Sequence, residues 1–252
     1  MILGLPVLVL VLRALASGSL LTALTTPAVI DALWLSAITT GVTVALVLLL
    51  GLPLALAMAR GRLPGRTLVE TIVDLPIVLP PSVAGLALLL VFGRRGLFGD
   101  ELAALGLTLP FTTAAVVLAQ FFVAAPFFIR SARTGFGSVE RELEDAARVD
   151  GATERNVFRW ITTPLAAPAL AAGLVMCWAR ALGEFGATII FAGSIEGRTQ
   201  TLPLLVYGQF QSSDLDSAIA AATILVLAAV VALVAVRGLR WSRVLDTRVA
   251  AT

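Results

Sequence analysis

The stretch ERELEDAARVDGATERNVFRWITTPLA (140–166) is strongly charged, although the chain around it is apolar. Of the 252 residues, 59% are hydrophobic and 34 are charged (18 basic and 16 acidic), and ten of those 34 lie within 140–159. The charged fraction is 13%, whereas soluble domains carry about 25%. In hydrocarbon, helices satisfy every backbone polar group within one segment. The sequence therefore predicts an all-α, polytopic membrane protein with one charged internal loop.

Runs without charge predict where the chain crosses the bilayer, which takes about 20 residues per helix. Five runs stand out: 32–59, 75–92, 102–129, 161–179 and 217–236. The N-terminal stretch is apolar as far as Arg13. We interpret it as a short first span; the alternative is a signal peptide, whose small-residue end it has but whose basic start it lacks. About six transmembrane helices are expected, in a single domain (1–252) with its core at 32–238.

The basic residues are all arginine, and their positions predict the orientation of the chain. Under alternating topology, 13 arginines fall on the side that holds the turn after the second span, the charged loop and the C-terminal tail. Only four fall on the other side, and Arg180 lies within a span. By the positive-inside rule the arginine-rich side is cytoplasmic. We therefore expect a cytoplasmic C-terminus and external loops at 93–107 and 194–216.

The composition excludes several kinds of chemistry. The chain has no histidine, no lysine and one cysteine, Cys177. A Walker A loop needs lysine, a Ser-His-Asp triad needs histidine, and a lone cysteine argues against a thiolate metal site. We expect no enzyme activity, no catalytic residue, no metal site and no cofactor in this chain, so any ATP hydrolysis belongs to a partner.

The charged loop has the pattern of two short helices joined by a turn. Ser138 can cap the first helix, Gly151 can take the left-handed conformation that ends it, and Thr153 can cap the second. A narrow apolar face is expected from residues at i, i+3 and i+4: Leu143, Ala146 and Ala147. The loop could lie on the membrane, where the polar face should be basic. Here acidic residues mix with Arg148, which favours a protein partner.

The same loop resembles the EAA loop of ATP-binding-cassette (ABC) importer permeases. Asp145-Ala146-Ala147-x-x-x-Gly151, nine residues, then Ile161-x-x-Pro164 is similar to the family pattern E-A-A-x-x-x-G, nine residues, I-x-L-P. Asp145 replaces the family's glutamate and Thr163 its leucine. The resemblance implies a cytoplasmic coupling loop (138–163) that docks on an ATPase subunit. The implied coupling residues are Leu143, Glu144, Asp145, Ala146, Ala147, Gly151 and Pro164.

Two other stretches resemble the molybdate/tungstate permeases of that superfamily, to which sulfate/thiosulfate permeases are close relatives. They are LPIVLPPSVAGLALLLVFGRRGLFG (75–99) and LGEFGATIIFAGSIEGRTQTLPLLVY (182–207). The resemblance implies a type I importer permease fold in a prokaryotic cytoplasmic (inner) membrane. It also implies a homodimer, ATPase subunits that bind ATP and Mg, and an extracytoplasmic substrate-binding protein. Membrane lipid is expected as a further partner, and nucleic acid is not.

Charged residues inside membrane spans are candidates for function. Arg180 and Glu184 are spaced i, i+4, so they can neutralise each other or line the path. Glu70 and Asp74 repeat this spacing and are expected to be solvated charges at the interface. Consecutive prolines can break a helix or only kink it. The candidates for the path or its gate are Pro80, Pro81, Gly85, Arg180, Glu184, Phe185 and Gly186.

The leading functional hypothesis is the permease subunit of an ATP-driven molybdate or tungstate importer. The preference for this substrate rests on the resemblance alone, and a sulfate/thiosulfate permease is the alternative within the superfamily. A self-sufficient proton-coupled carrier with Glu70, Asp74 and Glu184 as proton sites is the alternative from another class. Such a carrier needs no docking loop. A membrane anchor or sensor without transport is a third interpretation.

Overall fold

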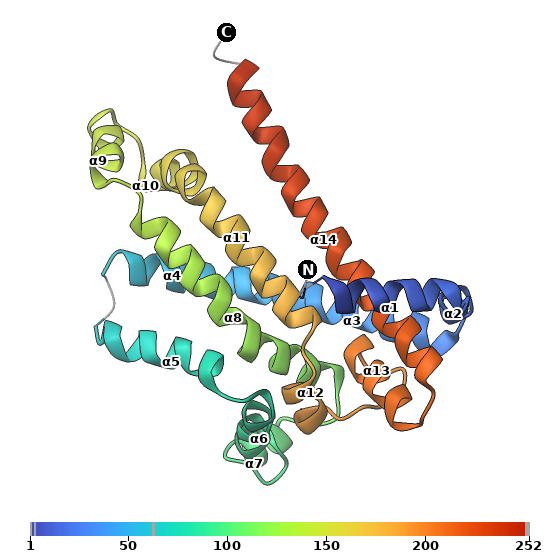
Figure 1. The fold of residues 1–252 in the computed structure, drawn as a ribbon. Coiled ribbons are helices and arrows are strands. Elements are labelled where there is room, and N and C mark those ends of the chain that lie inside the picture. Colours follow the sequence, from blue (N-terminus) through green and yellow to red (C-terminus); the bar gives the residue numbers. More distant parts are fainter. Residues whose placement is uncertain (1, 3, 62–63, 250–252) are drawn as a thin grey trace.

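The computed structural model describes residues 2, 4–61 and 64–249, and every regular element in this part of the chain is a helix. The predicted all-α class is therefore confirmed there. The helices are, in chain order (Figure 1), α1 (Leu5–Ala16), α2 (Ser19–Ala23), α3 (Pro27–Leu46), α4 (Leu52–Ala59), α5 (Arg66–Val78), α6 (Pro81–Phe92), α7 (Gly99–Ala104), α8 (Thr113–Gly137), α9 (Arg141–Val149), α10 (Glu154–Val157), α11 (Thr163–Leu182), α12 (Gly186–Phe191), α13 (Leu202–Gln211) and α14 (Leu215–Val249). Two π-turns, η1 (Val47–Gly51) and η2 (Phe158–Thr162), join α3 to α4 and α10 to α11.

Within the described residues, three helices are long and apolar enough to cross a membrane: Pro27–Ala59, Thr113–Gly137 and Glu154–Leu182. The pair formed by α5 and α6 counts as a fourth crossing if it is taken as one bent span. Two shorter apolar helices cover Leu5–Ala16 and Leu215–Val231. The six predicted spans thus correspond to three full helices, one broken pair and two shorter apolar helices.

Both π-turns lie directly before a proline, and their position explains why the helices continue. Gly51 ends η1 two residues before Pro53, and Thr162 ends η2 two residues before Pro164. Proline has no N–H to donate to the carbonyl four residues earlier. A wider turn absorbs this interruption locally. The chain therefore keeps its direction through η1 and η2, and both long helices remain single spans.

The consecutive prolines between α5 and α6 break the helix, which settles the alternative left open by the sequence. A residue before proline is disfavoured in the α region. Leu79 precedes Pro80 and has ψ 134°, and Pro80 precedes Pro81 and has ψ 136°. Two successive residues therefore leave the helical conformation, and the chain bends by 120°.

The predicted span over 102–129 is wrong in its first part. Residues 102–104 end α7, and α8 begins only at Thr113. Gly106 and Phe111 both have positive φ, +71° and +62°, which a continuous helix cannot accommodate. Thr112 then caps α8 by accepting a hydrogen bond from the backbone N–H of Ala115 at 3.2 Å. This turn contains no charged residue, so a search for charge-free runs could not reveal it.

The segment 194–216, predicted as an external loop, contains a packed helix. Its helix α13 buries Leu202, Leu204 and Leu205. The Leu202 backbone N–H donates to Ser36 Oγ on α3 at 2.8 Å. The run is too short to span a membrane, but it is apolar enough to pack against α3 and α14, so its side chains leave the solvent.

The core is organised around α8, which lies in the middle of the bundle (Figure 1). It crosses α11 at very short range, because small residues meet there. A Cβ on Gly135 would lie 2.6 Å from Ala169 Cβ, and one on Gly173 would lie 2.7 Å from Ser131 Cβ. Ser131 Oγ also donates to the Ala169 carbonyl at 2.7 Å. The two helices are therefore fixed to each other along their shared face.

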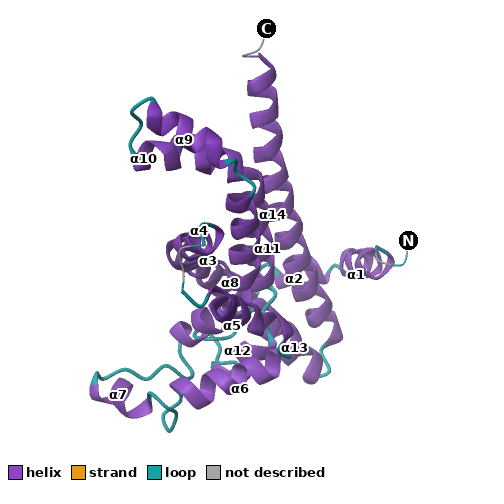
Figure 2. Ribbon diagram, turned by 90° about the vertical axis from the view of Figure 1, so that its left-hand side faces the viewer, coloured by secondary structure: helices purple, strands orange, loops and turns teal. Residues whose placement is uncertain are grey.

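Ion pairs and hydrogen bonds between segments show which of them lie at each end of the bundle. The turn after α4 and helix α9 lie at the same end, because Arg60 pairs with Glu144. At the other end, Thr113 Oγ1 donates to the carbonyl of Arg198 at 2.9 Å. Figures 1 and 2 place α9 and the C-terminal end of α14 in the upper part of the molecule, with α6, α7, α12 and α13 in the lower part. The segments that the arginines assign to one side thus share one end.

Candidate functional site

Helix α9 begins later than predicted. Ser138 does not cap it: this residue ends α8, where its Oγ donates to the Gly135 carbonyl at 2.9 Å. The N-cap of α9 is Glu140, which has an extended backbone, and Glu142 and Glu144 occupy the first turn. Carboxylates there favour the positive end of the helix dipole. The first turn of α9 is therefore acidic, and its cap lies two residues after the predicted Ser138.

The turn at Gly151 has the predicted left-handed conformation. Its φ is +88°, and a Cβ there would meet no atom within 4 Å. The Gly151 N–H donates to the carbonyl of Arg148 at 3.0 Å, and the Ala152 N–H donates to that of Ala147 at 2.9 Å. These two bonds form a Schellman motif. A side chain would have space here, so it is the backbone conformation alone that requires glycine.

The second predicted helix is the start of a long one. Thr153 caps α10 as predicted, accepting from the Asn156 N–H at 3.4 Å. However, α10 continues through η2 into α11, so Glu154–Leu182 is one helix of 29 residues. Pro164 thus lies in the first turn of α11 rather than at the start of a new segment. The charged loop is joined without a flexible link to a membrane helix.

Glu144 attaches α9 to the membrane helices. Its side chain is 3% exposed. Arg60, at the end of α4, pairs with its Oε1, and Thr162 Oγ1 in η2 donates to the same oxygen at 2.5 Å. Carboxylates are rarely buried unless paired. The position of α9 is therefore tied to two different membrane helices through one carboxylate.

Arg148 closes the loop from the other side. Its guanidinium contacts Asp145 Oδ1 and Glu154 Oε1, both at 2.6 Å. Hydrogen bonds to Glu154 and to Asp145 raise the pKa of Arg148 above its ordinary value. The mixed charges that favour a protein partner in the sequence therefore also hold the loop together internally.

The outward surface of the loop is apolar and open. Figure 2 shows α9 projecting away from the bundle. Leu143 is 46% exposed, Val149 88% and Trp160 67%. Of the predicted small face, Ala146 is exposed and Ala147 half-buried. We call Leu143, Ala146, Ala147 and Val149 the outer face of α9.

Three path candidates, Pro81, Gly85 and Gly186, meet where α6 crosses α12. A Cβ on Gly85 would lie 2.7 Å from the carbonyl oxygen of Ala187, and one on Gly186 would lie 2.6 Å from Pro81 Cβ. Pro80 sits at the break that starts α6. The crossing therefore joins LPPSVAG (79–85) to GEFGAT (183–188), two stretches that carry the resemblance and are far apart in the sequence.

Arg180 and Glu184 pair, as one of the two interpretations predicts. Arg180 Nη1 lies 2.6 Å from Glu184 Oε2, and the Glu184 side chain is fully buried. Although the i, i+4 spacing is typical of one helix, α11 ends at Leu182, so Glu184 lies beyond it. The chain turns at Gly183, and Glu184 Oε1 accepts from the backbone N–H of Ala187 at 2.7 Å. Glu184 thus connects the end of α11 to the start of α12.

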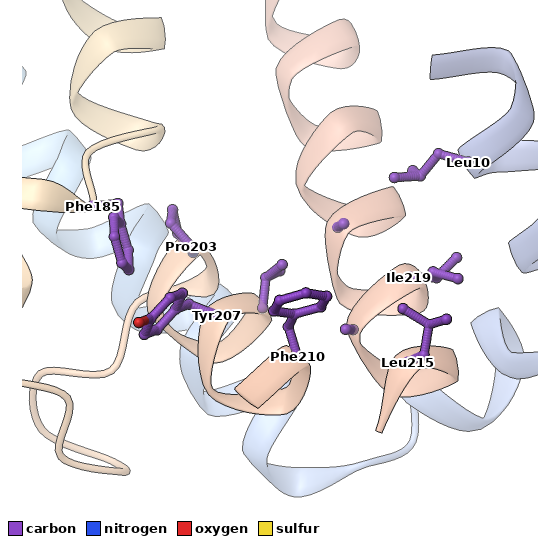
Figure 3. Close-up of a pocket in the computed structure, with 10 residues that line it drawn as sticks. Leu10, Phe185, Pro203, Tyr207, Phe210, Leu215 and Ile219 are labelled. Atoms are coloured by element: carbon purple, nitrogen blue, oxygen red, sulfur yellow. The ribbon is translucent and has the colours of Figure 1, made fainter. Parts of the chain in front are cut away.

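Phe185 is separate from the other path candidates. Its ring centroid lies 4.9 Å from that of Tyr207. Both side chains line an apolar cavity of about 380 Å³, which α1, α13 and α14 complete (Figure 3). Phe210 and Leu215 line the same cavity (Figure 3). The structure thus does not bring all seven path candidates together.

The acidic residues of α5, expected to be solvated charges at the interface, are partly exposed (Glu70 26% and Asp74 41%), and both also form ion pairs. Glu70 contacts Arg66 at 2.6 Å and Arg133 at 3.0 Å, while Asp74 lies 3.5 Å from Arg130. These pairs connect α5 to α8. Sequence reasoning used Arg130 and Arg133 only as markers of orientation. The spacing could have revealed these pairs, because the acids lie at i, i+4 on one helix and the arginines at i, i+3 on the other.

No metal site is found among the described residues, where no three His, Cys, Asp or Glu side chains form a group that could hold an ion.

Comparison with known proteins agrees with this architecture. The family model "binding-protein-dependent transport system inner membrane component" matches residues 48–250. The probable transport system permease protein NifC of Clostridium pasteurianum is 42% identical over 170 residues, which are 68% of this chain and 59% of NifC. The molybdenum transport system permease protein ModB of Mycobacterium tuberculosis is 43% identical over 180 residues, 71% of this chain and 67% of ModB. The sulfate transport system permease protein CysT of Salmonella typhimurium is 35% identical over 177 residues, 70% of this chain and 64% of CysT.

A solved structure supports the fold. The bacterial ABC transporter involved in the import of the acidic polysaccharide alginate gives a TM-score of 0.71 at 18% identity, covering 88% of this chain and 82% of that chain. At this identity the likeness concerns the fold alone. The family model, in contrast, covers most of the sequence. The chain therefore belongs to the family of binding-protein-dependent transport system inner membrane components.

Proposed function

We propose that this chain is the membrane-spanning permease subunit of an ATP-driven oxyanion importer, with molybdate or tungstate as its substrate. The observation that carries the proposal is the loop around α9. It has an open apolar outer face, a left-handed turn at Gly151 and a buried carboxylate, Glu144, that ties it to two membrane helices. A loop with these features is suited to receive a soluble subunit and to pass its movement to the membrane.

The coupling step assigns a role to each part of the loop. The outer face of α9 enters a groove of the ATPase subunit, where the small side chains of Ala146 and Ala147 allow close approach. Asp145 pairs with Arg148 within the loop and remains exposed. Glu144 transmits displacement of α9 to α4 through Arg60 and to α11 through Thr162. Pro164, in the first turn of α11, continues this connection into the span.

The path runs near the α6/α12 crossing. The contacts of Gly85 and Gly186 leave no room for a side chain between the two helices. Small shifts of α12 would therefore move α6 and the break at Pro80 and Pro81. The Arg180–Glu184 pair carries no net charge, so it fixes α12 without holding a dianion permanently.

The partners follow from the same scheme. A second copy of this chain completes the path, and ATPase subunits bind ATP and Mg at the end where α9 lies. An extracytoplasmic binding protein delivers the substrate at the end formed by α6, α7, α12 and α13. This orientation places the C-terminus in the cytoplasm, in agreement with the arginine distribution. No Walker A loop exists in a chain without lysine, so the energy source lies in the partner.

The choice of substrate is supported by similarity. The stretches that resemble molybdate/tungstate permeases pack against each other at the α6/α12 crossing. Identity is also higher to ModB, at 43%, than to the sulfate permease CysT, at 35%. The proton-coupled carrier is disfavoured because it needs no docking loop, and because Glu70, Asp74 and Glu184 each already pair with an arginine.

Uptake by the complete transporter tests the substrate. Membrane vesicles with the permease, its ATPase and its binding protein are supplied with labelled molybdate and an excess of unlabelled tungstate or sulfate. Tungstate is expected to suppress uptake, and sulfate is not. If sulfate competes equally or is itself imported in preference, the chain is a sulfate permease, and the coupling scheme stands.

A further inference from the structure

A groove of about 410 Å³ lies between α5, α8 and α11. Its walls on α5 and α11 are apolar, and α8 contributes the polar side chains. The lining residues are Ile77, Phe127, Arg130, Ser131, Thr134, Ala169 and Met176. Liquid water occupies about 30 Å³ per molecule. The groove therefore has room for a tetrahedral oxyanion with several of its waters.

The charges beside this groove do not balance. Ion pairs connect three arginines (Arg66, Arg130, Arg133) to two carboxylates (Glu70, Asp74). Glu70 is shared by Arg66 at 2.6 Å and Arg133 at 3.0 Å. Arg130 Nε is 3.5 Å from Asp74 Oδ1, and these side chains are 60% and 41% exposed. This pair is longer and more exposed than the two pairs of Glu70, so Arg130 is the arginine of the cluster whose charge is least neutralised.

Arg130 is also the donor that remains for a ligand. Ser131 Oγ donates to the Ala169 carbonyl at 2.7 Å, and Thr134 Oγ1 donates to the Arg130 carbonyl at 3.0 Å. Both hydroxyl protons are therefore engaged. The planar guanidinium has five N–H donors in a fork that fits two oxygens of a tetrahedral anion.

We propose that Arg130 forms an anion site in this groove and that its ligand is the tetrahedral oxyanion passing through the permease. This inference rests on the proposed function. The groove lies between the two helices that the coupling loop joins, since α8 leads into α9 and α11 follows from α10 and η2. Displacement of α9 would change the width of the groove. A lipid phosphate has the same chemistry, but binding it would serve no step linked to α9.

The site is built for brief occupancy. One guanidinium faces a dianion, and Asp74 competes for that guanidinium. Along a conduction path, binding must be strong enough to admit the ion and weak enough to release it. The competition gives two variants with opposite expected effects. Arg130→Gln removes the fork, whereas Asp74→Asn removes its competitor.

Binding of radiolabelled tungstate to the permease–ATPase complex tests the site. The complex is placed in nanodiscs of phosphatidylcholine, without the binding protein and without ATP. We expect Arg130→Gln to lower the affinity about ten- to a hundredfold, the range for a hydrogen bond to a charged group. Asp74→Asn should raise it. The matched control is Arg66→Gln, which removes the same charge from an arginine that does not line the groove and already pairs with Glu70, and should change affinity little.

Each other outcome contradicts the site in a distinct way. Equal losses in Arg130→Gln and Arg66→Gln would mean general attraction of anions. Displacement of tungstate by phosphatidylglycerol in the discs would assign Arg130 to a lipid headgroup. No saturable tungstate binding to the unmodified complex, or full binding to Arg130→Gln, would remove the site while uptake of oxyanion still supported the proposed function. Failure of the unmodified complete transporter to import any oxyanion would instead remove that function.

Discussion

At the scale of single residues, Glu144 has the greatest influence on how the loop can work. It is the residue directly before the segment that matches the family motif, and its carboxylate is the one in α9 that the fold buries. Its neighbour Asp145, which stands in the motif itself, is 69% exposed and pairs within the loop. The residue that joins α9 to the membrane is thus distinct from the residues available to a partner.

Replacing Glu144 with glutamine should uncouple α9 from the membrane helices. The amide oxygen can still accept from Thr162, but Arg60, which is 14% exposed, loses its counter-charge. Leaving one side of a largely buried pair unmatched costs about 1–3 kcal/mol. In the reconstituted complex, the ATPase should stay bound while molybdate imported per ATP hydrolysed falls. Asp145→Asn is the control and should change this ratio little, because exposed pairs contribute about 1 kcal/mol or less.

Restoring the charge pair in reverse provides the second arm of that experiment. Arg60→Glu combined with Glu144→Arg should recover part of the coupling ratio. If Glu144→Gln imports as much molybdate per ATP as the unmodified complex, α9 does not act through this carboxylate.

Residue-level features were predictable where they depend on neighbours in the chain. The positive φ of Gly151, the cap at Thr153 and the Arg180–Glu184 pair all involve residues at most five positions apart. The Arg60–Glu144 and Arg130–Asp74 pairs were not predictable, since they join positions 84 and 56 residues apart. Only the packing of α4 and α5 around α8 and α9 brings these charges together.

At the scale of elements, the α6/α12 crossing depends on two glycines. The Cβ that alanine would add at Gly85 would also lie 2.9 Å from Ile190 Cβ, in addition to its clash with the Ala187 backbone. Gly186 meets Pro81 in the same way. Because backbone atoms cannot rotate away, any larger residue must push the helices apart.

Gly85→Ala should therefore destabilise the protein. Overpacking of this kind costs about 1–3 kcal/mol, which should lower the thermal unfolding midpoint of the purified chain in detergent. Gly41→Ala provides the matched control: Gly41 lies in α3, and a Cβ there would meet no atom within 4 Å. That substitution should leave the midpoint unchanged or raise it, because alanine favours helix by about 0.5–1 kcal/mol over glycine. A midpoint for Gly85→Ala equal to that of Gly41→Ala would show that the two helices are not in close contact.

Charge-free runs predicted the ends of a helix only where no turn or cap interrupted the run. The run over 32–59 lies within Pro27–Ala59, and Pro53 is absorbed by η1. The run over 102–129 failed because Gly106, Phe111 and Thr112 form an uncharged turn. The helix α13 was missed because it is apolar but short. Hydropathy reports where a segment is buried, whereas caps and positive φ values decide where a helix begins.

At the scale of the whole molecule, the two ends of the bundle carry different features: ion pairs at one end and a close helix crossing at the other. At one end, an ion pair links the loop around α9 to the end of α4. Separate ion pairs link α5 to α8 through Glu70, Asp74, Arg130 and Arg133. The opposite end holds the α6/α12 crossing and the break at Pro80. In this arrangement, α8 and α11, which are packed against each other at Gly135 and Gly173, connect the two ends.

We expect that this chain has no energy source of its own and is driven through the outer face of α9. ATP-dependent molybdate uptake into proteoliposomes, together with co-purification of the ATPase, is to be measured for Ala147→Trp. Bulk on this face should abolish both, while the variant permease still inserts into the membrane. Ala104→Trp, on exposed α7 at the other end of the bundle, should co-purify with the ATPase normally. Concentrative uptake by the chain without its ATPase, or normal assembly and uptake by Ala147→Trp, would contradict the account.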